Sequence, residues 1–147
     1  MGADCGSVAD FLKFSKLGET YAPVDLESGE SGFRVAQDGI ETVFAHSGVS
    51  MRLIAYIEFG DGWVRGNHYH LRKVEHLCVL KGRLEARYFL PSAPKDVLVV
   101  TLCAGDVVEV LPGCVHEYTS AGFSAALEFS PQEFSAKDTI PFNVEKV

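Results

Sequence analysis

The chain of 147 residues has no long apolar run, no basic stretch, and no CxxC pair among its four cysteines. A bilayer-spanning helix needs about 20 consecutive apolar residues, and no segment here approaches that length. With a formal net charge of -7 and no stripe of Lys and Arg, nucleic acid is not an expected partner. Cysteines without paired spacing are expected to be reduced thiols.

What the chain does contain is typical of one globular domain. Hydrophobic residues make up 47% and charged residues 22% of the sequence, which is enough for a core and argues against disorder. The N-terminal segment MGADCGSVADF has acidic residues where a secretory signal needs basic ones. We therefore expect a cytoplasmic protein that does not associate with membranes.

Most of the sequence has the pattern of short strands. Residues 8–17 predict a short helix, and residues 23–32 predict an acidic surface loop. Strands are expected at 33–35 and 40–45 around an Asp38-Gly39 turn, and then repeatedly to residue 129 between Gly, Pro, Asp or Ser turns. Eight to ten short strands predict a β-sandwich or barrel. The predicted division is an N-terminal extension and loop (1–32), a barrel (33–130) and a tail packed on the barrel (131–147).

A candidate site begins in the segment WVRGNHYHLRKVEHLCVLKG, residues 63–82. On a strand, His68 and His70 leave the same face, with Cα atoms about 6.6 Å apart. Glu75 lies at an odd offset from His70, so residues 71–74 must contain a turn or bulge if Glu75 is to return to that face. Lys73 in this turn is expected to face solvent.

A second segment supplies another histidine. Gly105-Asp106 precedes a strand, and the Pro112-Gly113 turn then leads to His116. Three histidines and one carboxylate from separate strands, His68, His70, Glu75 and His116, would suit Zn²⁺, Fe²⁺, Mn²⁺, Ni²⁺ or Cu²⁺ with positions left open for water or substrate.

These two segments resemble the two motifs of the cupin superfamily, over residues 62–120. Gly62, His68, His70, Glu75 and Gly82 match the first motif at every position, and Gly105, Gly113 and His116 match the second. Leu111 stands where proline is usual and Ser120 where asparagine is frequent; neither is a ligand position. The resemblance implies a double-stranded β-helix, or jelly roll, with one divalent metal ion (Zn, Fe, Mn or Ni) in its mouth.

The residues before the first histidine resemble those of cupins that process nucleotide-activated deoxysugars. In Val64-Arg65-Gly66-Asn67-His68, Arg65 would bind substrate, through a diphosphate or carboxylate. A metal-dependent isomerase or epimerase of a nucleotide-activated keto sugar, or of a similar small carbonyl compound, is thus the first hypothesis. Tyr118, on the same strand face as His116, and Tyr56 are candidates for moving the proton.

The same ligand set leaves other functions open. An iron or nickel dioxygenase acting on a small molecule would use the same four residues, and a non-catalytic sugar- or metal-binding cupin would keep them as well. A homodimer is expected, since single-domain cupins commonly dimerise through sheet edges. The sequence does not name the metal or the substrate.

Overall fold

Two long strands organise the fold of the computed structural model, which describes residues 6–16, 34–37, 40–43 and 50–143. Strands β6 (Glu75–Leu90) and β9 (Val115–Ser130) have 16 residues each. They pair antiparallel from His76↔Phe129 to Phe89↔Val115, almost from end to end. All other strands of the main sheet are attached to this pair.

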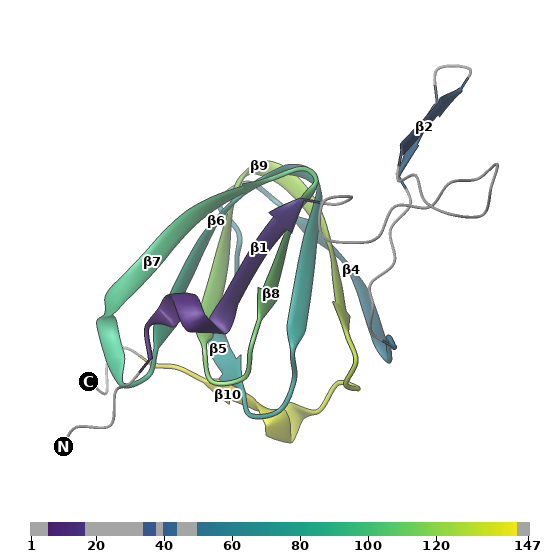
Figure 1. The fold of residues 1–147 in the computed structure, drawn as a ribbon. Coiled ribbons are helices and arrows are strands. Elements are labelled where there is room, and N and C mark those ends of the chain that lie inside the picture. The colour runs from purple at the N-terminus through teal and green to yellow at the C-terminus, as the bar shows by residue number, and fades with distance from the viewer. Residues whose placement is uncertain (1–5, 17–33, 38–39, 44–49, 144–147) are drawn as a thin grey trace.

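The attached strands form two layers because β6 and β9 each run through both. The first part of β6 pairs with β8, and the second part of β9 pairs with β4, while β1 pairs with the outer edge of β8. The second part of β6 pairs with β7, and the first part of β9 pairs with β5, whose other edge carries β10. The bounds are β1 Leu12–Lys16, β4 Leu53–Phe59, β5 Val64–His70, β7 Ala93–Cys103, β8 Asp106–Val110 and β10 Thr139–Pro141. Figure 1 shows the long strands arching over one end of the molecule.

Gly82 lies where β6 bends. The sequence predicts that a strand ends at Lys81-Gly82, but the structure continues it to Leu90 as one bent strand. Gly82 has a φ of 79°, and a Cβ there would lie 2.4 Å from the Phe123 carbonyl oxygen. Because glycine alone tolerates this conformation and contact, the chain bends without leaving the sheet.

The core lies between the layers. On β6 the residues of the main core cluster are odd before the bend, at Leu77 and Val79, and even after it, at Leu84, Ala86, Tyr88 and Leu90. The change of parity coincides with the register shifts between Val79 and Arg83. One irregularity therefore keeps the inner face of β6 apolar in both layers.

The predicted helix over residues 8–17 is only partly present. A 3-10 helix, η1 (Val8–Phe11), is followed by strand β1 over Leu12–Lys16. The helix prediction is wrong for the strand residues, because pairing with β8, from Leu12↔Val110 to Lys16↔Asp106, outweighs local propensity. Strands β1 and β10 lie outside the range 33–130 and still pair with the main sheet, while the predicted domain boundaries stay a prediction.

Two further predictions concern residues 17–49. Strands β2 (Arg34–Gln37) and β3 (Ile40–Val43) form the expected antiparallel pair, in a separate two-stranded sheet. The loop expected at residues 23–32 lies outside the described residues. In the part of the chain that the structure describes, no helix has the length and apolar character that a bilayer crossing requires.

Candidate metal centre

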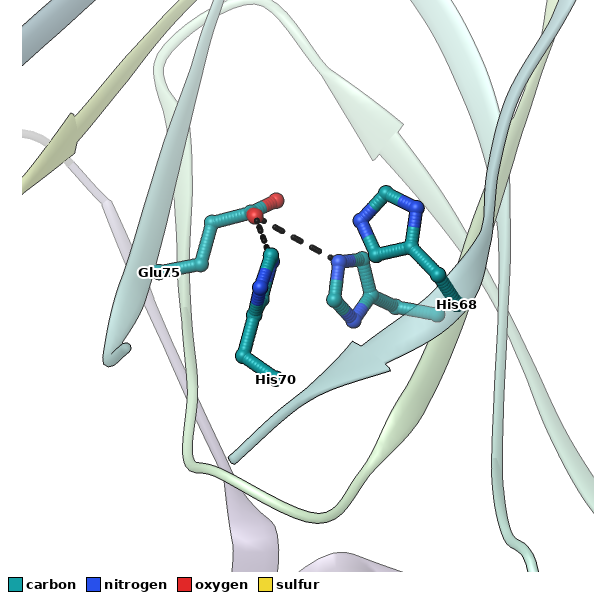
Figure 2. A group of neighbouring side chains, drawn as sticks. His68, His70 and Glu75 are labelled. Carbon is teal, nitrogen blue, oxygen red and sulfur yellow. Dashed lines mark hydrogen bonds and ion pairs between the residues drawn. The ribbon is translucent and has the colours of Figure 1, made fainter. Parts of the chain in front are cut away.

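Four side chains from three strands meet between the two layers. His68 and His70 lie on β5, Glu75 begins β6, and His116 lies on β9. Their ligand atoms all lie within 4.8 Å of one another. Figure 2 shows the side chains of His68, His70 and Glu75 turned toward one another. The predicted set therefore comes together in space, and metal binding by it stays a prediction.

The segment between His70 and Glu75 bends as the parity of their positions requires. Strand β5 ends at His70, residues 71–74 are not part of a strand, and β6 begins at Glu75. Glu75 Oε2 then lies 3.1 Å from His70 Nε2 and 3.4 Å from His116 Nε2. One carboxylate oxygen thus faces two imidazole rings.

The Pro112-Gly113 turn brings His116 to the site. Gly113 has a φ of 92°, and its N–H donates to the His70 carbonyl oxygen at 2.8 Å. On β9, His116 lies directly opposite His68 of β5, and the centroids of the two rings are 4.8 Å apart. The turn is therefore tied to the strand whose histidines it faces.

A β-bulge in β5 turns Arg65 toward the same cavity. Arg65 and His68 are three residues apart, so a regular strand would point them to opposite faces. The pairing with β9 shifts between Gly66 and His68, where Gly66 has a φ of 107° and Asn67 a φ of 59°. Because the bulge adds one residue, Arg65 and His68 both line the cavity.

Hydrogen bonds behind the rings determine how two imidazoles face the cavity. His116 Nδ1 lies 3.1 Å from the Cys114 carbonyl oxygen, which can only accept, so Nδ1 carries the hydrogen. Thr139 Oγ1 donates to the Ser135 carbonyl oxygen and accepts from His70 Nδ1 at 3.4 Å. In the neutral form of both rings, Nε2 therefore presents a lone pair to the cavity.

This arrangement fits a bound cation. Two Nε2 lone pairs beside Glu75 Oε2 repel it, and a positive charge offsets this repulsion. The Lys73 ammonium lies 3.4 Å from the same oxygen, and a proton or a metal ion among the ligand atoms would add to its effect. Within the described chain, the buried His116 Nε2 has no hydrogen-bond partner. Three imidazoles and one carboxylate are a donor set suited to Zn²⁺, Fe²⁺, Mn²⁺ or Ni²⁺.

Burial and proximity shift the pKa values of the cluster. Burial, and then the neighbouring His116 and His70, lower the pKa of His68 to about 4, so its ring is neutral near pH 7. Burial alone would raise the pKa of Glu75, but His116, His70 and Lys73 hold it well below its usual value. Burial alone would lower the pKa of His116, but the Glu75 carboxylate raises it. The field around Glu75 thus favours a positive charge beside it.

Lys73 lies inside the site, so the prediction that it faces solvent is wrong. Lys73 is 4% exposed, and its Nζ lies 3.4 Å from Glu75 Oε2 and donates to Glu128 Oε1. The ion pairs of the Lys73 ammonium with two carboxylates compensate for the hydration that it loses on burial. The sequence around residues 71–74 contains no local signal for this inward orientation.

Glu128 was not among the residues proposed from the sequence. It is 5% exposed and lines the cavity, and its Oε2 lies 3.6 Å from Arg65 Nη2. Because β9 is one strand from Val115 to Ser130, Glu128 is in phase with His116 and Tyr118. Treating residues 115–130 as one strand would have placed it on the inner face.

The two candidate tyrosines lie in different places. Tyr118 is 2% exposed and lines the cavity, and its hydroxyl has no hydrogen-bond partner among the described residues. Burial, and then the neighbouring Tyr88, raise the pKa of Tyr118 well above its usual value. Tyr56 is 61% exposed and donates to Glu58 on the outer face of β4, while Ile57 and Phe59 of that strand line the cavity. The structure does not bring Tyr56 to the site.

The cavity itself is small. Its volume is about 50 Å³. That is well below the roughly 300–1,000 Å³ of pockets that enclose a drug-sized ligand. An ion and one end of a small molecule fit, while the rest of a larger ligand would lie at the mouth, where the Arg65 side chain is 53% exposed.

Solved structures share this fold along nearly the whole chain. QdtA, a sugar 3,4-ketoisomerase from Thermoanaerobacterium thermosaccharolyticum in complex with TDP, matches with a TM-score of 0.70 and 15% identity over 92% of this chain and 90% of that chain. A mutant of that enzyme was crystallised with TDP-4-keto-6-deoxyglucose. A 3,4-ketoisomerase from Helicobacter canadensis matches with a TM-score of 0.68 and 12% identity over 92% of each chain.

A third match covers only part of a larger protein. CapF, a capsular polysaccharide assembling protein from Staphylococcus aureus, matches with a TM-score of 0.59 and 19% identity over 76% of this chain and 34% of that chain. No family model and no curated protein matches the sequence. At these identities the likeness shows the fold alone, and that fold is the all-β, cupin-type double-stranded β-helix that the sequence predicts.

Proposed function

We propose that the protein is an isomerase of a nucleotide-activated keto sugar and that it uses a divalent metal ion bound by His68, His70, Glu75 and His116. The observation that carries the proposal is the clustering of these four ligand atoms within 4.8 Å, at a cavity of the barrel. The sugar 3,4-ketoisomerases with the same fold support a substrate of this class.

The chemistry explains why such a cavity is useful. Moving a keto group to the neighbouring carbon requires loss of a proton beside the carbonyl and gain of a proton at the former carbonyl carbon. Negative charge develops on the carbonyl oxygen in between. A bound divalent ion would supply Lewis-acid polarisation of the carbonyl.

Three other residues have roles in this proposal. The unpartnered Tyr118 hydroxyl donates a hydrogen bond to a substrate oxygen. Lys73, buried beside Glu75, adds a positive charge at the cavity that both residues line. Arg65, at the mouth, binds the diphosphate, for which a guanidinium fork is well suited. The nucleotide then lies outside the small cavity.

Deuterium exchange tests the isomerase. Protein purified without added metal is analysed for its metal content, stripped with a chelator and incubated with TDP-4-keto-6-deoxyglucose in D₂O. We expect NMR to show deuterium at the carbon beside the carbonyl and a shifted keto group, with activity lost on chelation and restored by one of Zn²⁺, Fe²⁺, Mn²⁺ or Ni²⁺. Tyr118→Phe should lower the rate about 100-fold, and His68→Ala should abolish the response to metal.

The outcomes separate the parts of the proposal. Exchange that persists in fully stripped protein would remove the metal from the mechanism and leave the isomerase. Absence of exchange with every metal, together with no thermal stabilisation by the nucleotide sugar, would refute the isomerase. Tyr56→Phe, on the outer face of β4, serves as the matched control and should retain the wild-type rate.

The same donor set also suits a dioxygenase, which the experiment distinguishes. Three histidines and one carboxylate can hold Fe²⁺ or Ni²⁺ with open positions. Oxygen consumption after Fe²⁺ reconstitution, with no isotope exchange, would favour this alternative. Recovery of unchanged ligand in both assays would favour a binding protein.

A further inference from the structure

The bend between His70 and Glu75 is held by hydrogen bonds to the C-terminal segment, residues 131–143. Four consecutive backbone N–H groups, at residues 71–74, donate to only two residues of that segment. Leu71 donates to the Asp138 carbonyl oxygen at 3.0 Å, and Arg72 and Lys73 donate to Asp138 Oδ1 and Oδ2 at 2.7 and 3.1 Å. Val74 donates to Gln132 Oε1 at 2.9 Å. Asp138 thus accepts three of the four.

The same segment also lies behind His70. Strand β10 pairs with β5, so that Thr139 is opposite His70, and Thr139 Oγ1 lies 3.4 Å from His70 Nδ1. Asp138 Oδ2 lies 3.8 Å from the same nitrogen. One residue therefore touches the bend and lies beside the ring that the bend must meet.

We infer that Asp138 is a positioning residue of the metal centre. Its carboxylate fixes the shape of residues 71–73, which determines where Glu75 returns relative to His70. Its charge lies behind the His70 ring, on the side away from the cavity, where carboxylates orient metal-binding histidines in other proteins. The inference rests on the proposed metal binding and adds a residue from outside both sequence motifs.

Asp138 accepts most of the backbone hydrogen bonds of the bend, and the Lys73 side chain adds ion pairs with Glu75 and Glu128. Main-chain N–H groups that lose their partners in a partly buried bend are unfavourable to leave unpaired, so the bend would move to recover hydrogen bonds with water. Glu75 Oε2 lies within 3.4 Å of both His70 and His116. A shift of about 1 Å at Glu75 would therefore spoil the donor set, because metal–ligand distances tolerate about 0.2 Å.

Cobalt binding tests the inference without relying on activity. Wild type, Asp138→Ala and Asp138→Asn are titrated with Co²⁺, whose visible spectrum reports ligand number and geometry. We expect Asp138→Ala to raise the Kd about 10–100-fold and to change the spectrum of the bound ion. Asp138→Asn keeps one oxygen acceptor and should give an intermediate Kd. Glu133→Ala removes an exposed carboxylate of the same segment, which lies 3.7 Å from Arg52, and should match wild type.

The results distinguish failure of the proposed role of Asp138 from failure of the proposed metal binding. If wild type binds Co²⁺ and both Asp138 variants bind it with the same Kd and spectrum, the inference is overturned and the metal centre stands. If the variants lose only thermal stability, Asp138 is a structural clamp and the inference is equally overturned. If wild type binds no Co²⁺, the metal proposal fails and this inference fails with it. Asp138→Asn carries the test by itself should Asp138→Ala not fold.

Discussion

At the scale of single residues, Gly66 has the strictest requirement near the site. It has a φ of 107°, and a Cβ there would lie 2.5 Å from the His116 carbonyl oxygen. Real Cβ atoms do not approach a backbone oxygen so closely, so a side chain would push β5 away from β9. The bulge that points Arg65 into the cavity thus depends on glycine at this position.

Gly66→Ala should therefore destabilise the protein and disturb the site together. We expect a loss of about 3 kcal/mol in the free energy of unfolding, from backbone strain and the displaced strand. Denaturant unfolding measures this loss, and the Co²⁺ spectrum reports the site.

Gly62→Ala is the matched control for this substitution. Gly62 has a φ of 73°, but a Cβ there has nothing within 4 Å. Strain alone should cost about 1 kcal/mol, with the Co²⁺ spectrum unchanged. Equal losses for the two variants would contradict the role of the close approach to His116.

Buried charges also act at the residue scale. Arg65, Glu128, Lys73 and Glu75 form a chain in which each charge faces one of opposite sign. Removing Lys73 would leave two buried carboxylates, Glu75 and Glu128, without the ammonium between them, which typically costs about 3–5 kcal/mol. This series of charges therefore links the mouth of the cavity, at Arg65, to the proposed metal ligands.

At the scale of elements, Asp106 attaches three strands to one another. It begins β8, accepts from the Cys103 N–H at the end of β7 at 2.8 Å, and pairs with Lys16 of β1 at 2.8 Å. Burial alone would raise the pKa of Asp106, but the hydrogen bond from Cys103 and the ion pair with Lys16 hold it below its usual value. The ionised carboxylate therefore stabilises this edge of the sheet.

The stabilisation by Asp106 should depend on pH. A carboxylate whose pKa is lower in the folded state contributes stability above its unfolded pKa of about 4 and loses it as the pH falls through the folded value. Asp106→Asn should thus cost about 1 kcal/mol near pH 7 and progressively less below pH 4. Urea unfolding from pH 7 to pH 3 measures the difference. Glu85→Gln, at an exposed position of β6, is the control for the loss of one surface carboxylate.

At the scale of the whole molecule, the proposed ligands join the two layers. Glu75 comes from the part of β6 that pairs with β8, while His68, His70 and His116 come from the layer of β5 and the first part of β9. An ion shared by them would hold the layers together. Metal binding should then stabilise the barrel as a unit.

This coupling predicts a metal-dependent melting temperature. An ion that binds only the folded chain, at 100 times its Kd, adds about 2.7 kcal/mol, which corresponds to roughly 5–10 °C for a chain of this size. Thermal unfolding of stripped protein with increasing Zn²⁺ measures the shift. His68→Ala should reduce it strongly, and an unchanged melting temperature in wild type would count against the metal centre.

The fold class and the identities of the clustered residues follow from the sequence. Turn residues and period-two alternation predicted a β-sandwich or barrel. The resemblance of two segments to the cupin motifs implied the jelly roll and the set of His68, His70, Glu75 and His116. These signals are local, since each depends on strand parity or on a turn a few residues long. The bend before Glu75 followed from parity in the same way.

The surroundings of that cluster depend on long-range contacts in the folded protein. Lys73 turns inward because Glu128 comes from a strand 55 residues away, and Leu12–Lys16 is a strand because β8 offers an edge. Tyr56 faces outward, whereas Asp138 returns from the C-terminal segment to hold the bend at residues 71–73. Such contacts join segments far apart in the chain, so no local sequence pattern encodes them. These interactions form, and contribute to stability, only when the barrel has folded.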